Sequence, residues 1–172
     1  MILIELKADP FPKDQLPEKL EEHGIHINRY AEMFFAHPSF QTEYASDMVI
    51  AVASLHEIGL ENGATLSEIF QQLEKTGLKP CPANTGLFLR LAWKDQPQSR
   101  NSVLSGTHTS PDMAVNVISE IMETDDSFPK GLYLRNVDGI LWLRGYVCDP
   151  SYRFSGDDLF AFKSESGCTD YI

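Results

Sequence analysis

The run LYLRNVDGILWLRGY, residues 132–146, constrains the fold more than any other part of this sequence. It contains two alternating segments that meet at Asp138–Gly139, a dipeptide typical of two-residue β-hairpin turns. A turn of that length fixes which residues oppose each other across the hairpin. The expected cross-strand pairs are Val137 with Ile140, Arg135 with Trp142, and Tyr133 with Arg144.

This register gives the hairpin two different faces, because side chains alternate along a strand. The first is a core face of leucines: Leu132, Leu134, Leu141 and Leu143. The second carries arginines and aromatic residues: Tyr133, Arg135, Trp142, Arg144 and Tyr146. Opposed residues lie about 5 Å apart, so the arginines can stack on the rings across the strands. Two interpretations stay open: a cation–π ladder that covers the sheet, or a binding surface, since Trp, Tyr and Arg are enriched at interaction hot spots.

Other segments also have the composition of strands. They are residues 2–6, 47–55, 87–94, 102–108 and 158–162. Within LFLRLAWK (87–94), strand alternation separates Arg90 from the leucines and Trp93. Arg90 therefore joins the arginine and aromatic residues of the hairpin as a candidate binding residue. Residues 113–119 suit either a helix, which Ser110–Pro111–Asp112 could start, or a strand rich in Val and Ile.

Helical signals come before these strands. A first helix is expected from Pro17 to His23, and Asn28 can cap a second. Thr65 with Glu68 forms a capping box at the start of a third. Together the patterns predict an α+β fold in which N-terminal helices pack on a mostly antiparallel sheet built from residues 87–163. The chain of 172 residues is long enough for one domain, which we place at residues 1–163, followed by a flexible tail at 164–172.

The net charge of −11, from 25 acidic and 14 basic side chains, limits the classes of partner. A field of that sign repels nucleic acids and anionic membranes, and it favours a solvated surface or a basic protein partner. No apolar run approaches the roughly 18 residues of a membrane helix, and the N-terminus lacks the basic region of a signal peptide. Cys81, Cys148 and Cys168 include no close pair, so a reducing cytoplasm fits best. The oligomeric state is left open.

Few residues indicate chemistry. Cys81 has no nearby base or helix N-terminus to form a thiolate, so we expect a buried structural cysteine. The alternative hypothesis is a small enzyme of the hydrolase or transferase type, in which His108, which lies among hydroxyl residues, combines with Arg90, Asp157 and Cys81 in a cleft. The HGIH pair, His23 and His26, lacks a third ligand, so we predict no metal site and no cofactor.

Five segments together resemble an uncharacterised group of small bacterial proteins: NGATLSEIF, GLKPCP, LRLAWKDQ, FPKGLYLRNVDGILWLRGY and DDLFAF. The likeness covers about residues 58–163. It implies a strand at residues 113–119 and carries over no catalytic residues, because the group has no established activity. The leading hypothesis is a cytoplasmic, non-enzymatic binding or regulatory protein that uses the arginine and aromatic face. An antitoxin or immunity role is one form of it, because acidic proteins can neutralise basic toxins.

Overall fold

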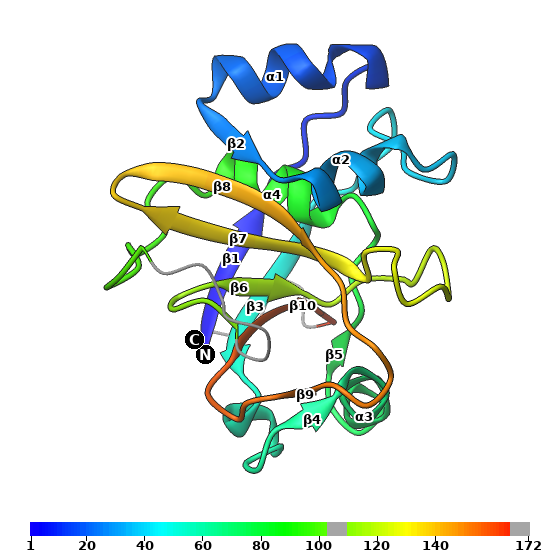
Figure 1. The fold of residues 1–172 in the computed structure, drawn as a ribbon, viewed down its shortest axis with the longest axis vertical. Coiled ribbons are helices and arrows are strands. Elements are labelled where there is room, and N and C mark those ends of the chain that lie inside the picture. The colour runs from blue at the N-terminus through cyan, green and yellow to red at the C-terminus, as the bar shows by residue number, and fades with distance from the viewer. Residues whose placement is uncertain (103–109, 166–172) are drawn as a thin grey trace.

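The structure, a computed structural model, describes residues 1–102 and 110–165 (Figure 1). Its central hairpin joins β7 (Gly131–Val137) to β8 (Ile140–Tyr146). The register has Val137 opposite Ile140 and Arg135 opposite Trp142, as predicted. Asp138 and Gly139 both have positive φ, 52° and 81°, which is the conformation that a two-residue turn of type I′ requires.

The hairpin belongs to an eight-stranded, mostly antiparallel sheet. Its order is β1 (Ile2–Leu6), β3 (Met48–Ser54), β10 (Leu159–Ser164), β6 (Val115–Val117), β7, β8 and β2 (Ile25–Ile27), with β5 (Leu78–Lys79) also beside β10. Two pairs are parallel, β10 with β6 and β8 with β2. A second, two-stranded sheet joins β4 (Ala64–Thr65) to β9 (Arg153–Phe154). The α+β class is therefore confirmed.

The expectation that the sheet is built from residues 87–163 alone is wrong. Strands β1, β2, β3 and β5 come from the first 79 residues. The segment MVIAVAS of β3 is apolar on both faces, so it needs a neighbour on each side and covering layers above and below. It lies between β1 and β10, where both conditions are met.

Within the described ranges, four α-helices cover the sheet. They are α1 (Leu16–Glu22), α2 (Arg29–Ala36), α3 (Leu66–Leu73) and α4 (Thr85–Ala92), with single 3₁₀ turns at Lys13–Gln15 and His56–Ile58. Helices α1, α2 and α4 gather near β2 and β8, whereas α3 lies beside the small β4–β9 sheet (Figure 1). The Asn28 side chain caps α2 by accepting from the Ala31 amide at 2.9 Å. The predicted capping box of Thr65 and Glu68 is confirmed at α3.

The prediction of a strand at residues 87–94 is wrong, because this segment forms helix α4. The segment is apolar at nearly every position, which is also typical of a helix buried on all sides, and Leu87, Phe88 and Leu89 are all buried. The segment contains no β-branched residue, while Leu, Arg and Ala favour helices. Arg90 therefore belongs to a buried helix rather than to a strand face.

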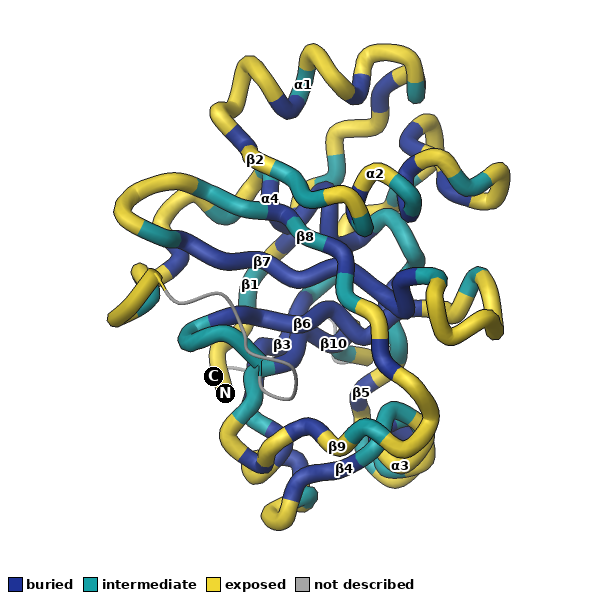
Figure 2. Tube along the Cα trace, viewed as in Figure 1, coloured by how far each residue is buried: buried dark blue, intermediate teal, exposed yellow. Residues whose placement is uncertain are grey.

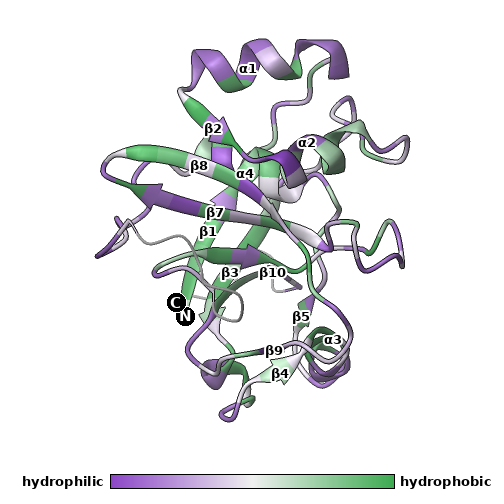
Figure 3. Ribbon diagram, in the orientation of Figure 1, coloured by the Kyte–Doolittle hydropathy of each residue, from purple (hydrophilic) through white to green (hydrophobic). Residues whose placement is uncertain are grey.

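The sheet separates two hydrophobic cores. One, which includes Leu132, Leu134 and Leu143, lies on the side of α1, α2 and α4. The other contains Ile69 of α3 together with Phe160 and Phe162 of β10. Figure 2 shows β7 buried along almost its whole length and β8 less so. Figure 3 shows α1 largely hydrophilic, in contrast to β1 and β3, so α1 is an outer layer.

The remaining expectations concern single segments. The strand expected within 113–119 is confirmed as β6. The strand expected at 102–108 lies almost wholly outside the described residues. Strand β10 continues to Ser164, which pairs with Leu78, so the first residue of the expected tail at 164–172 belongs to the sheet. Among the described residues, no helix is long and apolar enough to cross a membrane.

Candidate functional site

The hairpin face that carries arginines and aromatic residues, here called the outer face, is divided into a covered part and an open part. Tyr133 and Arg135 on β7 are only 8% and 2% exposed. Trp142 and Arg144 on β8 are half-buried. The difference arises because residues 99–101 and Asp112 lie over Arg135 on β7, whereas β8 lies one strand nearer the edge of the sheet.

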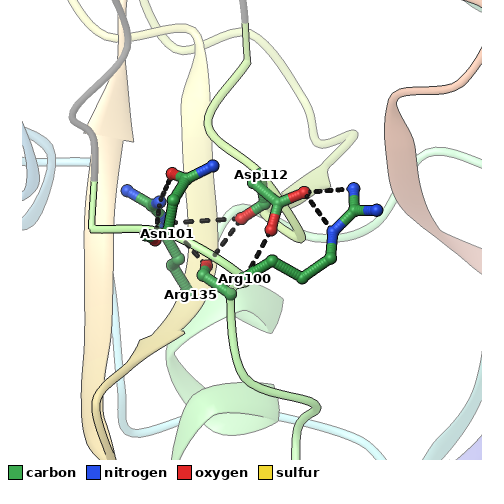
Figure 4. Close-up of polar contacts among 5 residues, drawn as sticks. Arg100, Asn101, Asp112 and Arg135 are labelled. Carbon is green, nitrogen blue, oxygen red and sulfur yellow. Dashed lines mark hydrogen bonds and ion pairs between the residues drawn. The ribbon is translucent and has the colours of Figure 1, made fainter.

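Arg135 is held by a network of polar contacts (Figure 4). Its Nε donates to Ser99 Oγ at 2.8 Å, and its Nη2 donates to the Asn101 carbonyl oxygen at 2.9 Å. The Asp112 carbonyl oxygen also accepts from Nε, at 3.3 Å. Through these hydrogen bonds, Arg135 holds residues 99–101 and Asp112 against β7. This explains why the guanidinium is buried, and it assigns Arg135 a structural task.

Arg100 completes this network from the solvent side. Figure 4 shows Arg100 and Arg135 approaching Asp112 from opposite directions. Arg100 Nη2 lies 2.5 Å from Asp112 Oδ1, and the Arg100 amide donates to Oδ2 at 2.6 Å. Both contacts with Arg100 hold the pKa of the Asp112 carboxyl below its usual value. The pKa of Arg135 is lowered by its burial, against the opposing effect of Asp112.

The open part consists of His26, Trp142 and Arg144, which we call the Trp142 patch. His26 on β2 is opposite Trp142 in the parallel register, and the two ring centroids are 5.1 Å apart. The guanidinium carbon of Arg144 lies 4.9 Å from the centroid of the Trp142 ring. The tryptophan ring therefore contacts both an imidazole and a guanidinium, on a strand that is paired on both sides.

The arginine that stacks on Trp142 is not the one that cross-strand pairing suggested. Arg135 is opposite Trp142, but its guanidinium is directed to Ser99 and Asn101. Arg144 lies two residues beyond Trp142 on the same face of β8 and provides the cation–π contact. Strand alternation alone could have identified Arg144 as a neighbour of Trp142.

Arg144 also contacts the tyrosine opposite it. Burial raises the pKa of the Tyr133 hydroxyl, and the positive charge of Arg144 and its hydrogen bond to that hydroxyl act in the other direction. Arg144 Nε is buried and has no hydrogen-bond acceptor among the residues that the structure describes. No ion pair joins Arg144 to an acidic side chain of residues 1–102 or 110–165.

Sequence reasoning missed His26 as a member of the patch. HGIH has the spacing of some metal-binding pairs, but among the described residues no group of three or more His, Cys, Asp or Glu side chains could hold a metal ion. The useful signal was the alternation in Ile25–His26–Ile27. Ile25 lies in the core, and the exposed His26 points to the other side of the sheet.

Two predicted binding residues lie away from the patch. The Tyr146 ring packs against Phe154 in the second core, with 6.1 Å between the ring centroids, and burial raises the pKa of its hydroxyl. Arg90 is 0% exposed in α4. Its Nη1 donates to Gln96 Oε1 at 2.5 Å, its Nη2 donates to the Trp93 carbonyl oxygen, and burial lowers its pKa to about 10.

The residues considered for catalysis do not form a common cleft in the described structure. Cys81 is fully buried, and burial raises the pKa of its thiol to about 12, which makes the thiolate inaccessible at neutral pH. This confirms the structural interpretation of Cys81. Asp157 lies in an exposed turn between β9 and β10, whereas Arg90 is in the core. His108 lies outside the described residues.

The Trp142 patch is thus defined by its own geometry: a half-buried tryptophan ring, an exposed imidazole and a guanidinium without an acidic partner in the described ranges. Comparison of the chain with protein-family models, with curated proteins and with solved structures gave no match. What the patch can do follows from the chemistry of these side chains. It can stack on a planar or aliphatic group and donate charged hydrogen bonds beside it.

Proposed function

We propose that this protein is a non-enzymatic binding or regulatory protein that holds a protein partner through the Trp142 patch. The observation that supports the proposal best is the position of Trp142. Its ring is accessible, yet it is fixed by His26 at 5.1 Å and by Arg144 at 4.9 Å. Tryptophan and arginine are the residue types most enriched among those that dominate binding energies.

The rigidity of the patch favours binding. A side chain that is already immobilised loses little conformational freedom when a partner arrives, so more of the contact energy is available for affinity. Trp142 belongs to a strand with hydrogen-bonded neighbours on both sides, β7 and β2. The patch is therefore a preorganised contact surface.

The charge of the chain supports a protein partner of net positive charge. With a net charge of −11, long-range attraction favours basic proteins and disfavours nucleic acids. We place this interaction in the cytoplasm, in keeping with Cys81 and Cys148, which are free thiols. Neutralisation of a basic toxin is one role of this kind.

Partner capture tests the proposal. The tagged protein and its Trp142→Ala variant are used as baits in an extract of the source organism, and bound proteins are quantified by mass spectrometry. Tyr44→Ala is the matched control, because Tyr44 is an aromatic residue that is 77% exposed in a different part of the fold. We expect at least one protein to be retained by the wild type and by Tyr44→Ala and lost with Trp142→Ala. Equal recovery with Trp142→Ala would refute a binding role for the patch.

A further inference from the structure

The arginines of the second half of the chain differ in what receives their hydrogen bonds. Arg100 and Arg153 each form an ion pair with a carboxylate, that of Asp112 and that of Glu68. Arg135 donates to Ser99 and Asn101, and Arg90 donates to Gln96 and the Trp93 carbonyl. Arg144 has the Tyr133 hydroxyl and the Trp142 ring, and no carboxylate of the described residues. A guanidinium has five N–H donors, so Arg144 can donate more hydrogen bonds than the described residues accept from it.

The remaining hydrogen-bond donors of Arg144 matter for binding because the side chain is partly buried. Arg144 is half-buried and its Nε is buried. Water therefore solvates this guanidinium less well than it solvates a fully exposed arginine. A carboxylate that meets a guanidinium in such a place forms charge-assisted hydrogen bonds, which are stronger than neutral ones. The Trp142 ring lies against the guanidinium, so it limits the directions from which a carboxylate can approach.

We propose that the Trp142 patch receives a side-chain carboxylate of the partner protein on Arg144, while an apolar side chain next to that carboxylate packs on Trp142. This inference rests on the proposed function and adds the chemistry of the contact. The charge complementarity is local: a partner whose net charge is positive presents one acidic residue at the patch. Long-range attraction and local pairing are thus separate contributions.

A titration followed by NMR tests this pairing. The probe is the acetylated and amidated peptide Lys-Leu-Glu-Leu-Lys, and the comparison peptide has glutamine in place of glutamate. The readouts are the indole N–H signal of Trp142 and the Nε–H signal of Arg144. Because the glutamine peptide carries more positive charge, a chain with a net charge of −11 attracts it more strongly at long range. A preference for glutamate therefore cannot come from the net charge.

We expect the glutamate peptide to shift both signals with an affinity at least about tenfold above that of the glutamine peptide, as befits a charged hydrogen bond. Arg144→Gln should abolish the preference, while Arg100→Gln should leave it unchanged. Equal affinities of the two peptides would overturn the inference. Inorganic phosphate is titrated as a third probe, and saturation by phosphate at lower concentrations than by the glutamate peptide would also overturn it in favour of a phosphate site.

Variants separate this inference from the proposed function. Thermal melting of Arg144→Gln is measured first, and binding is measured at a temperature at which the variant is fully folded. If Trp142→Ala loses the captured partner and folded Arg144→Gln keeps it with unchanged affinity, the patch binds a partner but carboxylate recognition is wrong. Loss of the partner in both variants, with retention in Arg100→Gln, supports both proposals.

Discussion

Arg144 and Trp142 lie on the same strand, two residues apart, with the guanidinium carbon 4.9 Å from the centroid of the indole ring. Contacts of this kind contribute about 0.5–1 kcal/mol where they are partly exposed. Arg144→Gln should therefore lower the free energy of unfolding by about 1 kcal/mol, including the loss of its hydrogen bond to Tyr133. Urea denaturation followed by circular dichroism gives this value. A loss above about 3 kcal/mol, the cost of disrupting a buried ion pair, would mean that Arg144 is a core residue.

Arg135, on the covered part of the same face, should behave differently. Arg135→Met removes the buried donors to Ser99 Oγ and the Asn101 carbonyl oxygen. We expect a loss of about 3 kcal/mol in the free energy of unfolding, measured by the same denaturation. Arg100→Met is the control from the same network: Arg100 is exposed, so solvent screens its pair with Asp112 and the loss should be much smaller than for Arg135→Met. Similar losses in the two variants would contradict the structural role assigned to Arg135.

The capping box at α3 gives a local prediction. Thr65 Oγ1 accepts from the Glu68 amide at 3.3 Å, and Glu68 Oε2 accepts from the Thr65 amide at 2.7 Å. Thr65→Ala should lower the free energy of unfolding by about 1 kcal/mol. Ser67→Ala, at an exposed position of the same helix, should change it by less than about 0.5 kcal/mol. Chemical denaturation of both variants decides whether the helix begins where the structure has it.

Cys81 should be unreactive and should make stability depend on alkaline pH. Burial raises the pKa of its thiol from 9.0 to about 12. Between pH 9 and about 12, the folded chain keeps the thiol proton of Cys81, whereas the unfolded chain loses it. The stabilisation is therefore complete below pH 9 and is lost as the pH rises towards 12, by up to about 1.4 kcal/mol per pH unit.

Denaturation of the wild type and of Cys81→Ala at pH 8, 9 and 10 gives the slope of the free energy of unfolding against pH for each protein. The slope of the variant should be shallower, because the Cys81 thiol is gone. It need not be zero, because other groups still titrate. Alkylation at pH 7.5 in a Cys168→Ala background gives a second readout, and Cys81 should react only on the timescale of unfolding. Fast alkylation of Cys81 in the native protein would contradict its burial.

The hairpin was predictable from sequence because its information is local. Asp138–Gly139 determines the turn, and the turn determines which residues share a face. How far that face is exposed was not predictable, because the cover over Arg135 comes from Ser99 and Asn101, more than 30 positions away in the chain. The Trp142 patch was not predictable for the same reason, because it depends on the parallel pairing of β2 with β8, which places His26 beside Trp142.

Helix α4 shows the opposite case, in which a local pattern suggested the wrong structure. A fully buried helix has no polar face, so its sequence lacks the helical period that periodicity analysis requires. The error also moved Arg90 from the core to a supposed surface. The buried Cys81, by contrast, was correctly predicted, because its neighbours offered nothing that could stabilise a thiolate.

The central claim is that Trp142 contributes to binding more than to folding. The direct measurement is the effect of Trp142→Ala on two free energies in the same buffer: that of unfolding, by urea denaturation, and that of binding to the purified captured partner, by calorimetry. We predict a loss of at least about 2 kcal/mol in binding, or roughly 30-fold in Kd, with a loss of less than about 1.5 kcal/mol in unfolding. An unchanged Kd together with a loss of about 3 kcal/mol in the free energy of unfolding, as for a buried tryptophan, would contradict the claim.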